Sequence, residues 1–121
     1  MNKYSLELGM TTLASPETMP LYDDIWARTD KLTLPGGSAL NSARASKHAN
    51  RSGCSVAYFG CIADDSEGQT LERSCQEAGI ECYLEKTTEE PTGKCGAIIV
   101  GKERTLVANI AAAKKFTLSY L

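Results

Sequence analysis

Hydrophobic and polar residues repeat with two different periods along this chain, and the two periods predict a mixed α/β fold. Apolar positions recur at helical spacing over 20–29 and again over 38–50, with polar residues between them. The run 55–62 is almost wholly apolar and lies between two helical segments. A run of this kind is typical of a strand that is buried on both faces of a parallel sheet.

The segment after this strand carries clear helix boundaries. Ser66 and Gln69 fit a capping box at the start, and Gly79 follows the last apolar position. Helix, strand, helix and strand in this order predict a doubly wound α/β arrangement, with the helices on the faces of the sheet.

After Gly79 the pattern of apolar and polar residues changes to shorter alternating runs separated by turns. We interpret these runs as hairpin-type strands that form a small β-rich addition to the α/β core. Two short strands are also expected earlier in the chain, one before the helical segment 20–29 and one after it. The expected strands lie at 10–14, 31–34, 80–85, 94–100 and 103–110, and the apolar pattern of 111–121 continues without a stop signal.

Length and charge narrow the class of protein. A chain of 121 residues suits one domain, and its formal net charge is -2 with no basic run longer than Lys114-Lys115. Nucleic acid is therefore not an expected partner. No apolar stretch reaches membrane-spanning length and the first residues lack a signal-peptide core, so we expect a cytoplasmic protein, with the nucleus as an alternative.

Cysteine, histidine and carboxylate patterns offer no metal site. The five cysteines include no Cys-x-x-Cys pair, and His48 is the only histidine. Cys61, Cys75 and Cys95 lie in apolar runs and are expected to be buried as small hydrophobes. The pair Asp64-Asp65 is expected to favour a helix N-terminus, and Glu89-Glu90 to form a solvated turn.

The most informative segment is Leu-Pro-Gly-Gly-Ser-Ala-Leu-Asn-Ser-Ala at 34–43. Gly36 and Gly37 remove the Cβ atoms that would keep a ligand away from the backbone. Asn41, one turn into the following helix, offers an acceptor and two donors to a ligand above the diglycine, as sugar hydroxyls require. The alternative is an ordinary turn in which Ser38 caps the helix.

Four motifs then follow one another along the chain: Gly-Gly-Ser-Ala-Leu-Asn-Ser at 36–42, Tyr-Phe-Gly-Cys-Ile-Ala-Asp-Asp at 58–65 with Gly68, Pro-Thr-Gly-Lys-Cys at 91–95, and Arg-Thr-Leu-Val-Ala-Asn-Ile-Ala-Ala-Ala at 104–113. With these motifs the chain resembles the ribokinase-like, or pfkB, carbohydrate kinases, and within them the adenosine kinase branch. The resemblance implies an α/β/α core with a small β-sheet lid and transfer of the γ-phosphoryl group of ATP, with Mg²⁺, to the 5′-hydroxyl of adenosine, a step of purine salvage.

The resemblance also implies roles for individual residues. Gly36 and Gly37 would lie against the ribose, Asn41 would hydrogen-bond its hydroxyls, and Ser38 would lie on the purine side. Arg104 matches a position that faces the phosphates, where a guanidinium stabilises the transferring group. An apolar wall around the base would be formed by Leu13, Cys95, Leu106 and Ala108.

Two family elements have no counterpart here. An Asn-Pro-x-x-Asp strand is absent before Tyr4, and no Gly-x-Gly-Asp, which carries the general base, occurs in the chain. Smaller departures are Thr11, where the family commonly has glutamine, and Ala39-Leu40, where adenosine kinases commonly have Thr-Gln. We therefore expect residues 1–121 to be a partial kinase domain, inactive alone and monomeric when complete.

Two other functions stay open at this point. A sugar kinase of the same family would need polar residues where the apolar wall stands. A non-catalytic remnant would bind a nucleoside or a partner chain without phosphorylating it. The coding sequence beyond Leu121 would separate these alternatives.

Overall fold

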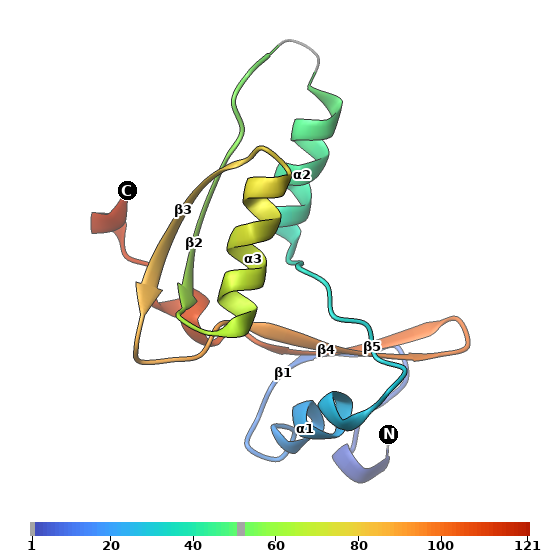
Figure 1. The fold of residues 1–121 in the computed structure, drawn as a ribbon. Coiled ribbons are helices and arrows are strands. Elements are labelled where there is room, and N and C mark those ends of the chain that lie inside the picture. The colour runs from blue at the N-terminus through green and yellow to red at the C-terminus, as the bar shows by residue number, and fades with distance from the viewer. Residues whose placement is uncertain (1, 51–52) are drawn as a thin grey trace. The chain divides into compact units, whose positions relative to one another are not determined.

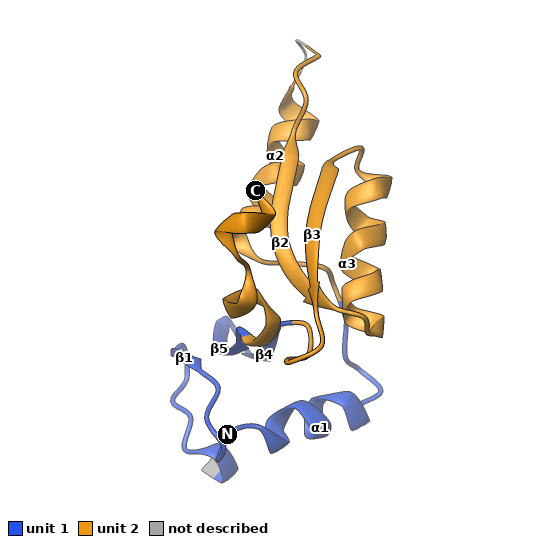
Figure 2. Cartoon of the chain, turned by 90° about the vertical axis from the view of Figure 1, so that its left-hand side faces the viewer, with its two compact units in different colours: residues 1–33, 93–110 blue, residues 34–92, 111–121 orange. Residues whose placement is uncertain are grey.

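The chain divides into two compact units in the computed structural model, which describes residues 2–50 and 53–121. Residues 1–33 and 93–110 form the first unit, and residues 34–92 and 111–121 form the second (Figure 2). The polypeptide therefore passes between the units three times, after Thr33, Thr92 and Ile110. Each unit has its own sheet and its own small core.

The first unit is a three-stranded sheet with one helix. After the short 3₁₀ turn η1 (Asn2–Tyr4) come β1 (Thr11–Leu13), α1 (Pro20–Ala27), β4 (Lys94–Val100) and β5 (Glu103–Asn109) (Figure 1). The strand order is β1-β5-β4, with β1 parallel to β5 and β4 antiparallel to it. Gly101 turns the β4-β5 hairpin at a φ of 61°, a value that suits glycine. The expected hairpin and the short strand at 10–14 are confirmed.

Helix α1 covers one face of this sheet. Leu21 of the helix, Val107 of β5 and Leu6 form the buried core of the unit. The Tyr22 hydroxyl donates a 2.9 Å hydrogen bond to the Val107 carbonyl. Gly96 of β4 lies beneath the helix, where an added Cβ would meet a side-chain atom of Ile25 at 3.0 Å. The side chains of alternate strand residues therefore point away from α1.

The second unit is a parallel β-α-β unit with an additional helix. It contains α2 (Ser38–Ala49), β2 (Ala57–Ala63), α3 (Ser66–Glu77) and β3 (Glu81–Thr87), followed by the 3₁₀ turns η2 (Ala111–Lys115) and η3 (Leu118–Tyr120). The parallel register runs from Ala57 opposite Glu81 to Ala63 opposite Thr87. The expectation that 80–85 is a hairpin-type strand is wrong, because α3 carries the chain back to start β3 in parallel with β2.

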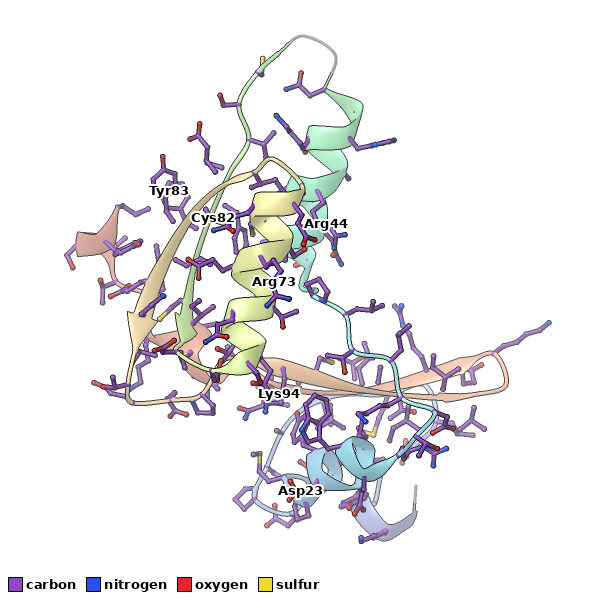
Figure 3. The ribbon with its side chains drawn as sticks, viewed as in Figure 1. Asp23, Arg44, Arg73, Cys82, Tyr83 and Lys94 are labelled. Atoms are coloured by element: carbon purple, nitrogen blue, oxygen red, sulfur yellow. The ribbon has the colours of Figure 1, made fainter. Side chains whose placement is uncertain are left out.

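Both helices of the second unit pack on the same face of its sheet. Leu40 of α2 and Cys75 of α3 are fully buried in one cluster, against which Tyr58 and Cys82 of the strands pack. Figure 3 shows Cys82 on the helix side of β3 and Tyr83 on the opposite side. The doubly wound expectation placed helices on both faces, and within this unit that placement is wrong.

The opposite face of β2 and β3 exposes aromatic side chains. Phe59 and Tyr83 stack with ring centroids 4.9 Å apart, and each is 44% exposed. Cys61, two residues along the same face, is buried, and η2 contacts β2. The strand predicted to be buried on both faces thus has helices packed on one face, whereas the other face is covered only in part.

We expect the isolated chain to self-associate through this aromatic face, because exposed apolar patches on sheet faces favour association. Sedimentation velocity should show oligomers whose share rises with concentration. A Phe59→Ser, Tyr83→Ser double variant should shift the distribution toward monomer, whereas the exposed pair Ser46→Ala and Gln69→Ala should leave it unchanged. A parent chain that stays monomeric up to about 100 μM would contradict this prediction.

The helix starts differ in detail from the sequence-based expectations. Gly37 is the N-cap of α2, with φ 96° and no side-chain cap, and Ser38 is the first helical residue. Asp65 is the N-cap of α3 and accepts a 2.8 Å hydrogen bond from the Gly68 amide. The caps expected at Ser38 and Ser66 are therefore wrong, whereas the charge expected at the start of α3 is confirmed for Asp65. Residues 31–34 form no strand.

Gly68 lies in the first turn of α3 with no room for a side chain. An added Cβ would lie 2.3 Å from the Ala63 carbonyl oxygen and 2.9 Å from Thr92 Oγ1. Gly68→Ala should therefore destabilise the chain by at least about 1 kcal/mol, although alanine is the better helix former at exposed positions. Urea unfolding followed by circular dichroism measures the change, with Gln69→Ala as the matched exposed control. An unchanged or raised midpoint for Gly68→Ala would contradict the packing described here.

Candidate functional site

The candidate site residues fall into two groups, one in each unit. Leu13, Cys95, Leu106, Ala108 and Arg104 belong to the sheet of the first unit. Gly36, Gly37, Ser38 and Asn41 belong to the start of α2 in the second unit.

The first group shares one face of the β1-β5-β4 sheet. Ala108 of β5 is paired with Leu13 of β1 on one side and with Cys95 of β4 on the other, so these three residues form a row across the strands. Leu106 stands two residues before Ala108, and alternate strand residues point to the same face. Val107, between them, is buried on the α1 side. Four residues from three separate chain segments are thus brought together on the face that α1 leaves uncovered.

This face is apolar and accessible within its unit. Leu13 is 62% exposed, Cys95 is exposed, and Leu106 and Ala108 are half-buried. Although the residue is exposed, partial shielding of the sulfur from water raises the pKa of the Cys95 thiol above its ordinary value. The burial expected for Cys95 from its apolar run is wrong, because its strand position directs it away from α1. Cys61 and Cys75 are buried as expected.

Strand register adds residues that sequence reasoning missed. Ala97 is paired with Leu106, and Ile99 is paired with Arg104, so both continue the same face along β4. The sequence feature that could have identified Ala97 and Ile99 is their alternation with Cys95 along the strand. Thr11 is the other partner of Leu106 and brings a hydroxyl to this otherwise apolar face.

Arg104 lies on the same face as the apolar row. It is exposed, and it stands two residues before Leu106 along β5. A rise of about 3.4 Å per residue places its Cα roughly 7 Å from that of Leu106. The sheet thus presents an apolar surface with a guanidinium at its end, a combination that suits a ligand with an apolar part and an anionic part.

The second group surrounds an open helix start. Gly36 and Gly37 are exposed, and a Cβ built on either glycine would meet nothing within 4 Å. Gly37 has a φ of 96°, which other residues adopt only with strain. Because no side chain caps α2, the first amide groups of the helix remain available as donors.

Asn41 lies one turn into α2 and is held by its backbone. Its amide nitrogen donates a 2.9 Å hydrogen bond to the Gly37 carbonyl, and its side chain is exposed. This backbone bond holds Asn41 one helical turn from Gly37. The side-chain amide can therefore serve a ligand at the same helix start with both donors and an acceptor.

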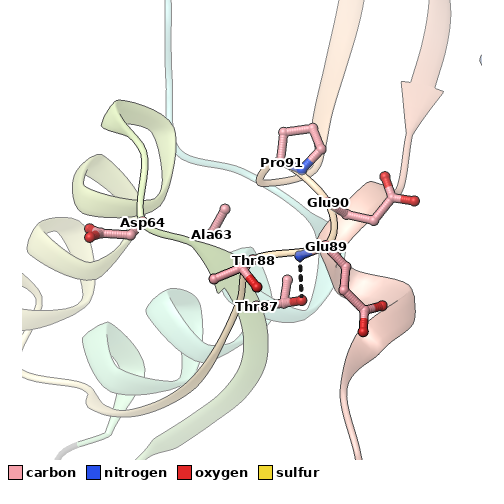
Figure 4. Close-up of a pocket in the computed structure, with 7 residues that line it drawn as sticks. All are labelled: Ala63, Asp64, Thr87, Thr88, Glu89, Glu90 and Pro91. Atoms are coloured by element: carbon pink, nitrogen blue, oxygen red, sulfur yellow. Dashed lines mark hydrogen bonds between the residues drawn. The ribbon is translucent and has the colours of Figure 1, made fainter.

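A shallow cavity lies at the carboxyl ends of β2 and β3. Its volume is about 370 Å³, and Thr87 Oγ1 accepts a 3.2 Å hydrogen bond from the Glu89 amide at its rim (Figure 4). Lys115 binds Glu89 at 2.7 Å and lowers the pKa of that carboxyl. The carboxylates make this cavity unsuitable for a phosphate. Its lining residues are Ala63, Asp64, Thr87, Thr88, Glu89, Glu90 and Pro91.

Within residues 2–50 and 53–121, no three His, Cys, Asp or Glu side chains are grouped so that they could hold a metal ion. None of the helices described there has the length and apolar character needed to cross a membrane.

The pfkB family of carbohydrate kinases matches residues 27–121, and the chain belongs to this family. Within it, the chain is similar to adenosine kinases. The adenosine kinase of Schizophyllum commune is 36% identical over 122 residues, a match that covers 100% of this chain and 35% of that protein.

Solved structures of adenosine kinases also resemble the chain. The apo enzyme of Trypanosoma brucei brucei is 39% identical with a TM-score of 0.89, over 98% of this chain and 37% of that one. The Anopheles gambiae enzyme in complex with P1,P4-di(adenosine-5) tetraphosphate is 30% identical with a TM-score of 0.89, over 99% of this chain and 36% of that one. The ribokinase-like α/β fold expected from the sequence is confirmed, and the chain spans little more than a third of the length of these relatives.

Proposed function

We propose that this chain carries the nucleoside-binding portion of an adenosine kinase, an enzyme that transfers the γ-phosphoryl group of ATP to the 5′-hydroxyl of adenosine and gives AMP. The observation that carries the proposal is the row of Leu13, Ala108 and Cys95 with Leu106 beside it, an accessible apolar face built from three strands. A flat purine buries apolar surface against such a face, and each square ångström is worth about 25 cal/mol.

The ribose is assigned to the start of α2. The open diglycine lets a sugar approach the backbone, and the Asn41 amide offers donors and an acceptor for two neighbouring hydroxyls. Ser38, the first residue of the helix, contributes an amide and a hydroxyl at the same place. Asn41 is thus the residue of this group whose side chain matters most for recognition.

Arg104 is the side chain of this chain that we assign to the phosphates. Its position beside the apolar face lets a guanidinium contact the transferring group, where positive charge stabilises the transition state. Mg²⁺ supplies charge neutralisation in such reactions when it is bound to the nucleotide. No three His, Cys, Asp or Glu side chains are grouped to hold a metal ion within the described residues, and we assign no Mg²⁺ ligand to this chain.

A sugar kinase is not favoured by this geometry. A free sugar presents hydroxyls on every side and requires a polar partner for each one that is buried. The face formed by Leu13, Cys95, Leu106 and Ala108 is itself apolar, and the polar side chains identified beside it are Thr11 and Arg104. The relatives compared above agree with this preference, because all are adenosine kinases.

A chimeric kinase tests the proposal. This chain would replace the matched part of the Schizophyllum commune enzyme, and phosphoryl transfer from ATP would be assayed with adenosine, D-ribose and D-fructose as acceptors. We expect turnover with adenosine in the usual kinase range, about 1 to 100 per second, and at least about a hundredfold less with either sugar. Turnover with a sugar but not with adenosine would contradict the proposal.

A further inference from the structure

Asp65 holds two separate parts of the second unit with one carboxylate. Its Oδ1 accepts the Gly68 amide at 2.8 Å, which caps α3, and also the Thr92 hydroxyl at 2.6 Å. Its Oδ2 accepts the Thr92 backbone amide at 2.9 Å. A helix cap requires only the first of these bonds. The other two bind a residue 27 positions further along the chain.

Thr92 is enclosed in this arrangement. It is only 3% exposed, and its Oγ1 accepts a 2.9 Å hydrogen bond from the Ala63 amide while donating to Asp65. Its hydroxyl therefore connects the end of β2 to the start of α3. Gly68 lies beside the same oxygen, because a Cβ added to the glycine would lie 2.9 Å from Thr92 Oγ1. We call Asp65, Thr92 and the Ala63 amide the Asp65 clasp.

The clasp lies where the chain leaves the second unit. Thr92 is the last residue before Gly93 and β4, and the neighbouring Pro91 carbonyl accepts a 2.9 Å bond from Ala112 just after the chain returns. On the other side of the same passage, an added Cβ on Gly93 would lie 2.6 Å from the Ile110 carbonyl oxygen. Pro91 and Ala112 are thus in close contact within the second unit, as are Gly93 and Ile110 within the first.

We propose that Asp65 is a positioning residue that acts through Thr92: it anchors the point from which the chain enters β4, in addition to capping α3. Cys95, the β4 member of the apolar row, follows Thr92 by three residues. The anchoring role does not depend on the proposed function, and the anchoring can be tested without any substrate.

Two substitutions separate the anchor from the cap. Asp65→Ser keeps an N-cap residue of comparable strength but has one oxygen and cannot hold both Thr92 groups. Thr92→Val keeps the shape of the side chain and removes its hydroxyl, and Thr92→Ser restores the hydroxyl. Backbone amide exchange, read by mass spectrometry at residue resolution on the full chain, reports each bond separately.

The expected results differ from amide to amide. In Asp65→Ser, exchange at the Thr92 amide should become about 10- to 100-fold faster, while the Gly68 amide should change less than about threefold. In Thr92→Val, the Ala63 amide should lose protection by a similar factor, and Thr92→Ser should recover it. The inference is overturned by a Thr92 amide that is unprotected in the parent, by unchanged Thr92 exchange in Asp65→Ser, or by equal losses at Gly68 and Thr92.

Discussion

The 121-residue chain on its own is expected to convert no measurable adenosine to AMP, although the chimeric kinase described above should turn over at about 1 to 100 per second. Phosphoryl transfer depends on positioning and on charge stabilisation around the transferring group. The sequence contains no Gly-x-Gly-Asp element to supply a general base, and the described residues include no group of three His, Cys, Asp or Glu side chains that could hold a metal ion. Arg104 alone cannot provide these functions.

A transfer assay with radiolabelled ATP measures this difference with high sensitivity. The isolated chain and the chimera would be assayed at equal concentration, with an Arg104→Ala chimera as a second comparison. We expect that variant to lose activity relative to the parent chimera, because it removes the charge assigned to the phosphates. Turnover by the isolated chain within the kinase range would show that the catalytic groups lie within these 121 residues after all.

Asn41→Ala in the chimera should weaken adenosine binding about ten- to hundredfold. The asparagine is exposed beside the open diglycine, and its loss would leave ribose hydroxyls without a partner in the closed complex. Such a loss costs about 1 to 3 kcal/mol, which corresponds to that range of affinity. Isothermal titration calorimetry with adenosine measures the change directly.

Ser46→Ala is the matched control for this variant. Ser46 is also exposed on α2 but lies beyond the diglycine motif, so its substitution tests for simple damage to the helix. We expect its affinity for adenosine to stay within about twofold of the parent. If Asn41→Ala bound adenosine as tightly as Ser46→Ala, the asparagine would be an ordinary helix residue and the sugar would be held elsewhere.

Periodicity and glycine positions were sufficient to predict most elements of the fold. The helices at 20–29 and 38–50 are α1 and α2 within a few residues, and Gly79, with φ 70°, follows the end of α3 as expected. The β4-β5 hairpin was also predictable, because Gly101 marks its turn. These features depend on residues that are close together in sequence.

The errors concern choices that are made by distant contacts. Ser66 is an ordinary candidate for a helix cap, but Asp65 takes the position because its carboxylate also binds Thr92. The 31–34 segment alternates like a strand but finds no partner strand. Whether 80–85 forms a hairpin or a crossover strand depends on its pairing with β2, which composition alone does not specify.

The candidate site was predictable in part, through its motifs. The resemblance selected Leu13, Cys95, Leu106 and Ala108, and the register of the sheet places all four on one face. Ala97 and Ile99 were missed, because alternation along β4 has meaning only once the face covered by α1 is known. The roles assigned to Leu13, Cys95, Leu106 and Ala108 as an apolar wall stay predictions, as do those assigned to Gly36, Gly37, Ser38, Asn41 and Arg104.

The most direct test of the central claim is to titrate adenosine and D-ribose into the chimeric kinase by calorimetry without ATP. An apolar face that accepts the purine predicts saturable adenosine binding at micromolar concentrations and no detectable ribose binding under the same conditions. A Leu106→Asn variant should weaken adenosine binding, because it places an unpartnered amide against the base. Ribose binding as tight as adenosine binding, unaffected by Leu106→Asn, would contradict the assignment of this chain to the nucleoside side of an adenosine kinase.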